Sequence, residues 1–293
     1  MKSVLIKKAG AFITPLLQTN QSGKVIGITS KGVFLLFSQK IVFLTSEDHD
    51  NPFMLHIDEL NQYPQGLTLN SIVQLKDRQL LVGEMSYDLA AITRTVPEPL
   101  PQVEALKGSR GMNSQLISIF QLLNSSDHQD SCIFVADALL NKVNPADRTK
   151  QDLWVSVQRF RQGVHKQDLQ TCVEVLKQIL GSGKGLTPSG DDFVTGYLLI
   201  MNCLTNSRGK LDEFTSQLNS TVLDLARSRT TWISGNIIEA ATMRLVDERV
   251  GLAARVLLGM CKMDPVTVAR KLESFGNSSG IDTFTGMVAA IVP

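Results

Sequence analysis

Residues 181–192 read GSGKGLTPSGDD and run directly into the apolar segment FVTGYLLI at 193–200. No other stretch of this length in the chain gathers so much glycine, hydroxyl and carboxylate. A second copy of its core lies near the C-terminus, because SGDDFVTG at 189–196 and SGIDTFTG at 279–286 share the pattern S-G-x-D-x-x-T-G. Apolar residues at helical spacing flank both copies, so the sequence predicts two helices that begin at a repeated polar motif.

The overall composition restricts the class of protein. The chain has 293 residues, of which 43% are hydrophobic and 19% charged, and its formal net charge is +1. This balance gives no basic face for nucleic acid. The first residues, MKSVLIKK, lack the apolar core of a signal peptide, and the longest apolar run, near 197–204, is too short to span a bilayer. The sequence therefore predicts a soluble, cytoplasmic protein without nucleic-acid or membrane partners.

Cysteines and histidines are few and scattered, and no C-x-x-C pair occurs: they are Cys132, Cys172, Cys203, Cys261, His49, His56, His128 and His165. The cysteines lie in apolar helical contexts, which favours buried free thiols over disulfides or a zinc site. The histidines are interpreted as surface or loop residues. No set of metal ligands is predicted.

The N-terminal part of the chain has a β pattern. Short runs rich in Val, Ile and Phe occur at 24–29, 33–37 and 40–45, and a hairpin is predicted over 70–84. The continuous apolar run FLLF at 34–37 indicates a sheet that is covered on both faces. Residues 50–66 are predicted to be a loop with one short helical turn.

The segment VPEPLP at 96–101 ends the β pattern, because neither a helix nor a central strand tolerates so many prolines. Apolar residues then recur at helical spacing to the C-terminus. The predicted fold class is α+β: a small N-terminal β-barrel or covered antiparallel sheet, followed by a mostly α-helical domain. The predicted limits are 1–96 for the β-rich domain, 97–112 for a Pro/Gly linker and 113–293 for the helical domain that carries both motif copies.

A purely structural interpretation of the two copies is available. Ser189 with Asp192, and Ser279 with Asp282, have the spacing of a capping box, in which a hydroxyl caps the helix and a carboxylate three residues later bonds back. Such a cap stabilises a helix by about 1 kcal/mol and needs no function. Arg229, which precedes the similar cluster of Thr230 and Ser234, adds a cation beside possible caps of the next helix.

Three details point beyond capping. Four glycines, Gly181, Gly183, Gly185 and Gly190, surround the first cap, which predicts special dihedral angles or a close approach. Gly196 and Gly286 lie inside the two helices, where glycine costs about 1 kcal/mol relative to alanine. We expect them to permit close contact of the two helices with each other. Asp191 and Asp192 are adjacent, so only one of them can serve a cap.

Two helix starts of this kind suit phosphate or carboxylate, because the amide ends of helices carry positive partial charge. The sequence predicts that both starts face one shared pocket for a small anion. Lys184 does not make the loop a Walker motif, since Gly185 follows it and a helical pattern precedes it. Lys184 either lends charge to the anion or is a solvated loop residue. Ser234 and Asn236 are possible helix caps, and Arg229, Thr230 and Ser234 are candidates for lining the pocket.

The sequence GKGLTPSGDD at 183–192 resembles the signature GPGLTPSxDD of the AllH-type family, and GNSSGID at 276–282 is similar to that family's GH[ST]SGxD element. The Thr-Thr…Ser segment at 230–234 also has a counterpart there. The resemblance covers the helical half of the chain. Two positions depart from the family pattern: Lys184 stands in place of proline, and Asn277 in place of a histidine that is a candidate acid–base group.

The resemblance implies a subunit of an oxamate carbamoyltransferase, which acts in allantoin breakdown, a branch of purine catabolism. With partner subunits it converts oxalurate and phosphate into oxamate and carbamoyl phosphate. The implied partners are a small anionic substrate and other protein subunits. Two alternatives stay open: a different phosphate- or nucleotide-dependent enzyme on the same scaffold, and a non-catalytic structural or ligand-sensing subunit.

The resemblance and the two motif copies together give a set of candidate site residues. The catalytic candidates are Asp191, Asp192 and Asp282. The candidates for binding substrate or phosphate are Lys184, Gly185, Thr187, Ser189, Gly190, Thr230, Ser234, Asn277, Ser278, Ser279 and Gly280. No cofactor is assigned from the residues, and Mg²⁺ is the candidate metal ion, to be held by a carboxylate that the caps do not use.

Overall fold

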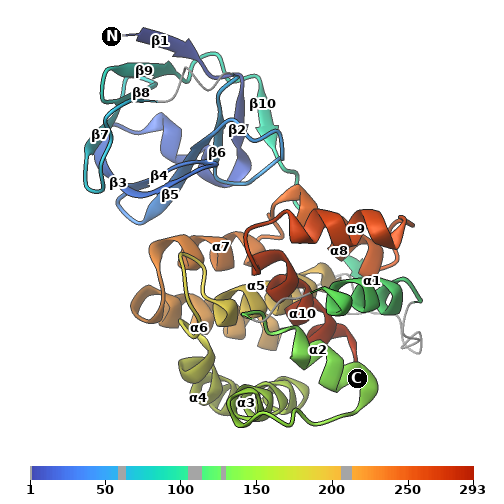
Figure 1. Ribbon diagram of the computed structural model, residues 1–293. Coiled ribbons are helices and arrows are strands. Elements are labelled where there is room, and N and C mark those ends of the chain that lie inside the picture. The colour runs from blue at the N-terminus through green and yellow to red at the C-terminus, as the bar shows by residue number, and fades with distance from the viewer. Residues whose placement is uncertain (1, 59–63, 105–113, 127–129, 206–212) are drawn as a thin grey trace. The chain divides into compact units, whose positions relative to one another are not determined.

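The computed structural model describes residues 2–58, 64–104, 114–126, 130–205 and 213–293 (Figure 1). Residues 105–112 of the predicted linker and the predicted loop histidine His128 lie outside these ranges. The chain divides into two compact units. One comprises Met1–Pro99 with Leu245–Glu248, and the other comprises Leu100–Arg244 with Arg249–Pro293.

The first unit contains one curled sheet of ten strands in the order β1-β9-β8-β7-β3-β4-β5-β6-β2-β10 (Figure 1). The strands are β1 (Lys2–Leu5), β2 (Lys8–Gly10), β3 (Gln21–Thr29), β4 (Gly32–Phe37), β5 (Lys40–Thr45), β6 (Met54–His56), β7 (Ile72–Lys76), β8 (Gln79–Val82), β9 (Met85–Asp88) and β10 (Arg94–Val96). Two short 3-10 helices, η1 (Ala11–Ile13) and η2 (Leu16–Gln18), follow β2.

The strands β3, β4 and β5 form an antiparallel meander where the sequence predicted it. Leu35 and Leu36 are adjacent in β4 and Ile41 and Val42 are adjacent in β5, so each pair points to opposite faces, and all four are buried, which confirms that the sheet is covered on both sides. The sheet is mixed, because β1 pairs with β9, β5 with β6 and β2 with β10 in parallel. The predicted loop at 50–66 contains the short strand β6.

The second unit is helical. Its helices are α1 (Ser114–Ser125), α2 (Ile133–Asn141), α3 (Arg148–His165), α4 (Leu169–Ile179), α5 (Ser189–Cys203), α6 (Glu213–Arg229), α7 (Trp232–Thr242), α8 (Glu248–Leu257), α9 (Pro265–Glu273) and α10 (Ser279–Ile291). Two short strands, β11 (Val103–Glu104) and β12 (Leu204–Thr205), pair in parallel. The predicted α+β class, with a β-rich part before a helical part, is confirmed.

Among the described helices, none combines the length and the apolar character that crossing a bilayer requires.

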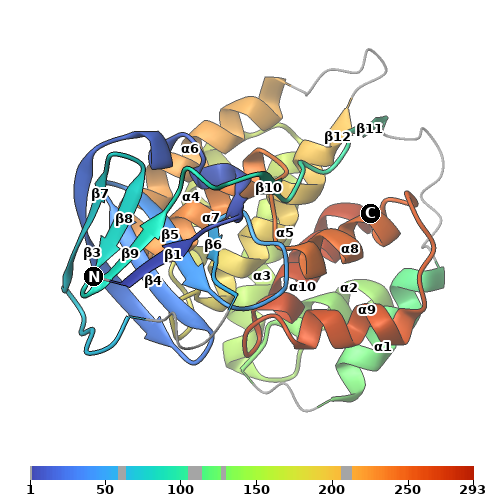
Figure 2. The ribbon, with the colours of Figure 1, turned by 90° about the horizontal axis from the view of Figure 1, so that it is seen from above.

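The helices α5 and α10, which begin at the two motif copies, form the centre of the helical unit (Figures 1 and 2). They pack against each other, α7 also packs on α5, and α2 and α9 pack on α10. Every residue of α5 from Gly190 to Ile200 is buried, as is every residue of α10 from Gly280 to Ala289. A helix buried on all sides belongs to a domain core, so the two motif copies start the two core helices.

Gly196 and Gly286 set how closely α5 and α10 approach. A Cβ atom added to Gly196 would overlap the carbonyl oxygen of Thr283, and one added to Gly286 would overlap that of Phe193. Phe193 and Thr283 occupy equivalent positions in the two copies, so the contact is made twice with the helices exchanged. The predicted role of these glycines is confirmed: they permit backbone-to-backbone packing.

We expect Gly196→Ala to destabilise the protein by about 3 kcal/mol or more, because the obstacle to the new methyl group is backbone and not a movable side chain. Urea unfolding of the wild type and the variant measures this loss. The control is Gly235→Ala in α7, where an added Cβ would meet nothing within 4 Å. That variant should be unchanged or more stable by about 0.5–1 kcal/mol. Equal effects at the two positions would contradict the packing argument.

Candidate functional site

The segments before α5 and α10 meet in the helical unit. The hydroxyl oxygens of Thr187, just before α5, and Ser279, the first residue of α10, lie 2.8 Å apart and share a hydrogen bond. The Ser279 hydroxyl also lies beside the carboxyl of Asp192 from the other helix. In the reciprocal contact, the Ser189 hydroxyl lies beside the carboxyl of Asp282. The predicted proximity of the two helix starts is confirmed, and their serines and aspartates pair crosswise.

The predicted capping boxes are wrong. The N-cap residue of α5 is Pro188 and that of α10 is Ser278, and neither cap position makes a side-chain cap bond. Loop carbonyls take the place of the hydroxyls, because the Gly190 amide donates to the carbonyl of Ser182 (2.9 Å) and the Gly280 amide to that of Phe275 (3.0 Å). The serine hydroxyls are thereby available for contacts between the two copies.

The loop before α5 can supply these carbonyls because it curls tightly. Gly181, Gly183 and Gly185 have φ angles of 78°, 118° and 90°, in the region that favours glycine. This confirms the special dihedral angles predicted for the loop. The tight path also means that the Gly190 and Gly280 amides, both predicted anion donors, already donate to carbonyls.

Asp191 holds the glycine-rich loop in place. Its Oδ1 accepts a hydrogen bond from the Gly181 amide (2.8 Å), and its Oδ2 accepts one from the Thr230 hydroxyl. Burial raises the pKa of Asp191, and the hydrogen bonds from Thr230 and Gly181 oppose that rise. Both carboxylate oxygens of Asp191 therefore accept hydrogen bonds from the protein itself. These contacts indicate that Asp191 positions the glycine-rich loop and that Thr230 helps by holding Asp191.

Asp192 and Asp282 differ from Asp191. Asp192 is 2% exposed and Asp282 is 0% exposed. Oδ1 of Asp282 accepts the Cys132 amide at 2.6 Å. In both carboxyls the Oδ2 atom is buried and has no hydrogen-bond partner within the described part of the chain. Two equivalent positions thus carry the same unpaired acceptor.

Burial raises the pKa of Asp192 well above its usual value. The Ser279 hydroxyl opposes this rise, and the charge of Asp282 adds to it. Burial also raises the pKa of Asp282, against hydrogen bonds from the Cys132 amide and the Ser189 hydroxyl. Two negative charges buried near each other repel, so the carboxyls of Asp192 and Asp282 resist losing both protons. The pair is therefore suited to retain a proton.

Cys132, just before α2, was predicted only as a buried thiol, and its place beside the carboxylates was not foreseen. Burial, together with the charge of Asp282, raises the pKa of the Cys132 thiol well above its usual value. The neighbouring Asp130 accepts a hydrogen bond from Ser189 through its carbonyl (3.4 Å). No local motif marks these two residues, because they reach the site from a distant part of the chain.

The remaining predicted residues divide by exposure. Lys184, Gly185 and Asn277 are exposed, whereas Thr187, Ser189, Ser278 and Ser279 are partly exposed. Ser234 is buried, and its hydroxyl lies beside the carboxyl of Asp191.

Neither Ser234 nor Asn236 caps α7. The cap is Thr231, whose hydroxyl accepts the Ser234 amide (3.0 Å) and donates to the carbonyl of Leu186 (2.7 Å). Thr231 thus ties the start of α7 to the glycine-rich loop.

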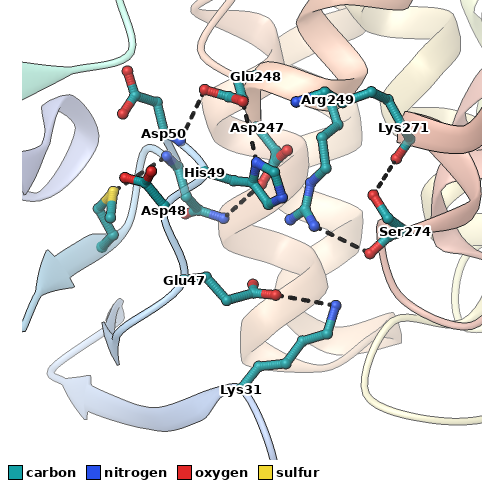
Figure 3. A network of polar contacts seen from close by, with 12 residues as sticks. Lys31, Glu47, Asp48, His49, Asp50, Asp247, Glu248, Arg249, Lys271 and Ser274 are labelled. Carbon is teal, nitrogen blue, oxygen red and sulfur yellow. Dashed lines mark hydrogen bonds and ion pairs between the residues drawn. The ribbon is translucent and has the colours of Figure 1, made fainter. Parts of the chain in front are cut away.

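Arg249 orders the loop before α10. It is 3% exposed and donates to the carbonyl of Ser274 at 3.1 Å (Figure 3). It also lies over the ring of Phe275, 5.0 Å from the ring centroid. The carbonyl of Phe275 is the one that accepts the Gly280 amide. A buried cation therefore fixes the loop in the second copy, where Asp191 and Thr230 do so in the first.

A separate polar network lies in the β-rich unit (Figure 3). Glu248 accepts the Asp50 amide (3.2 Å) and lies 3.1 Å from Nδ1 of His49. Lys8 donates to the carboxylate of Asp50 (3.0 Å). These groups satisfy one another, which indicates a structural role. Across the described ranges of both units, no three His, Cys, Asp or Glu residues gather as a metal site would require.

The fold and the site define a helical domain in which two related helix starts cover a pair of buried carboxyl groups. Residues 179–291 of this domain match the family described as oxamate carbamoyltransferase subunit AllH, which confirms the resemblance over this part of the chain. The match extends from the end of α4 to the end of α10 and includes both motif copies. It supports the interpretation of the chain as a subunit of such an enzyme. No solved structure matches the chain.

The raised pKa of Asp192 predicts a pH dependence of stability. Its pKa in the fold exceeds the unfolded value of about 4, so the folded state binds the proton more tightly. The free energy of unfolding should therefore fall as pH rises from about 4 through the folded pKa. Asp192→Asn, which cannot ionise, should show a smaller fall in urea unfolding between pH 5 and 8.

Asp147→Asn is the control for this measurement. Hydrogen bonds from Thr149 lower the pKa of the exposed Asp147, so its contribution is complete above about pH 5 and is lost on acidification. The unfolding free energy of this variant should run parallel to that of the wild type from pH 5 to 8. An Asp192→Asn profile parallel to the wild type would contradict the assignment.

The thiols should differ in reactivity. Cys132, Cys172 and Cys203 are buried, and burial raises the pKa of the last two to about 11. Cys261 is partly exposed. Since the thiolate is the reactive form, we expect iodoacetamide at pH 8 to modify Cys261 first in the folded protein. Peptide mass spectrometry identifies the site, and a rapid reaction at Cys132 would show that the carboxyl pair is open to solvent.

Proposed function

We propose that this chain is a subunit of an oxamate carbamoyltransferase-like enzyme and that the two helix starts bind its small anionic substrates. The reaction converts oxalurate and phosphate into oxamate and carbamoyl phosphate. The observation that carries the proposal is the 2.8 Å contact between Thr187 and Ser279, which joins the two motif copies at one place. The match of residues 179–291 to the AllH family supports the same assignment.

The chemistry requires positioning more than a covalent nucleophile. A phosphate oxygen attacks the ureido carbonyl carbon of oxalurate, a C–O bond forms, the C–N bond breaks, and the departing nitrogen takes up a proton to give oxamate. Holding the two reactants together and stabilising charge on oxygen supply most of the rate in such transfers. A carboxyl group whose pKa is raised by burial, such as that of Asp192, is suited to deliver a proton to the departing nitrogen.

Each part of the site has a role in this proposal. The hydroxyls of Thr187, Ser189 and Ser279 bind anionic oxygens, aided by the positive ends of α5 and α10. Asp192 and Asp282 orient an amide group or a Mg²⁺ ion. Ser278, Lys184 and Asn277 stay secondary candidates at the exposed rim.

The chain is proposed to act together with other protein subunits. The matched family is described as a subunit, which implies that further chains complete the enzyme. Asn277, which replaces the family's histidine, is exposed and lies just before α10. In this proposal, a partner subunit provides the acid–base group that the histidine provides elsewhere in the family.

A thermal-shift series tests the proposal on the full chain, with phosphate, carbamoyl phosphate, oxamate and ATP as ligands. A ligand at one hundred times its Kd stabilises the folded state by about 2.7 kcal/mol, which raises Tm by roughly 5 °C or more for a chain of this size. We expect this for carbamoyl phosphate and oxamate. Ser279→Ala should reduce the shift, and Ser118→Ala, which removes a partly exposed hydroxyl on α1, should not.

The other outcomes are equally informative. A shift with ATP alone would favour a nucleotide-dependent enzyme. The absence of any shift would contradict a binding site on this chain and favour a non-catalytic subunit. Equal shifts in wild type and Ser279→Ala would place binding away from the paired helix starts.

A further inference from the structure

Two buried carboxylate oxygens at the centre of the helical unit need a hydrogen-bond donor. They are Oδ2 of Asp192 and Oδ2 of Asp282, and neither has a partner within the described ranges. Buried acceptors are nearly always paired, because an unmade hydrogen bond retains the cost of removing the group from water. Since the same unpaired acceptor occurs at equivalent positions of both copies, it is a feature of the motif and not an isolated defect.

We infer that these two oxygens accept N–H groups of a bound ligand and thereby select compounds that carry a primary amide or carbamoyl NH₂. This inference rests on the proposed function, since it assumes that the paired helix starts form the substrate site. It assigns Asp192 and Asp282 as specificity-determining residues.

Neighbouring groups contact both carboxyls, and Oδ2 of each has no partner in the described part of the chain. Oδ1 of Asp282 accepts the Cys132 amide at 2.6 Å. The carboxyl of Asp192 lies beside the hydroxyls of Ser279 and Thr187. Groups fixed in this way are preorganised for a donor and lose little freedom on binding.

The environment favours a neutral N–H donor over the other ligands that these residues could take. An anion would meet acceptor oxygens that repel it. Mg²⁺ usually keeps several water molecules, and oxygens at 2% and 0% exposed residues leave little space for them. An NH₂ group is small and supplies two donors.

The hydroxyls nearby accommodate the opposite end of such a ligand. Thr187, Ser189 and Ser279 are partly exposed, whereas the carboxyls they contact are buried. A carboxylate or phosphate bound by the hydroxyls would therefore direct an attached NH₂ inward. Oxamate and carbamoyl phosphate have this form. Pyruvate and acetyl phosphate keep the same anion and carbonyl but carry a methyl group in place of the NH₂.

Isothermal titration of the full chain with these two matched pairs tests the inference. We expect oxamate to bind about tenfold or more tightly than pyruvate, and carbamoyl phosphate to exceed acetyl phosphate similarly, because the methyl group leaves the buried acceptors unpaired. Asp192→Leu and Asp282→Leu should bring each ratio towards one, because leucine removes the acceptor that distinguishes an NH₂ group from a methyl group. Asp147→Asn, an exposed helix cap, should keep the wild-type ratio.

The outcomes separate the two proposals. Equal affinity within both pairs would overturn the amide selection and leave the anion site intact. No binding of any of the four ligands would overturn the proposed function itself. A preference that persists in both leucine variants would assign the selection to other groups. If a leucine variant fails to fold, the near-isosteric Asp192→Asn and Asp282→Asn, each of which replaces an acceptor oxygen with an NH₂ donor, should lower the same ratios, and unchanged ratios would overturn the assignment.

Discussion

The close approach of α5 and α10 is the constraint on which the helical unit depends. Gly196 and Gly286 remove the side chains that would separate the helices, so each backbone packs on a carbonyl of the other. The starts of the two helices also meet, at the hydrogen bond between Thr187 and Ser279. The crossed contacts of Ser279 with Asp192 and of Ser189 with Asp282 follow from that approach. Packing and site geometry thus have one cause.

Burying two carboxyl groups in a helical core is costly unless hydrogen bonds compensate. Asp191 shows full compensation, because a loop amide and the Thr230 hydroxyl use both of its oxygens. Asp192 and Asp282 are compensated on one side only. A protein that needed these residues only for folding would gain stability by completing the second hydrogen bond or by losing the charge. The incomplete pairing therefore distinguishes Asp192 and Asp282 from Asp191, and it is the reason for proposing these two residues as ligand contacts.

Sequence reasoning succeeded where a residue is costly in its local context. Glycine inside a helix has no local benefit, so the positions of Gly196 and Gly286 in the sequence were enough to indicate a tertiary contact. The capping boxes failed because a loop carbonyl and a serine hydroxyl compete for the same amide, and the path of the loop decides between them. Cys132 and the parallel pairings of β1 and β2 were missed for a related reason, since they join segments far apart in sequence.

The assignment of Leu245–Glu248 to the β-rich unit affects how the protein can be divided experimentally. Glu248 contacts His49 and the Asp50 amide, and Asn51 donates to Asp247 at 3.5 Å. A fragment that ends at Pro99 would lose these partners, and a fragment that begins at Leu100 would carry four residues that belong to the other unit. The two units are therefore interleaved along the chain, and no single cut separates them.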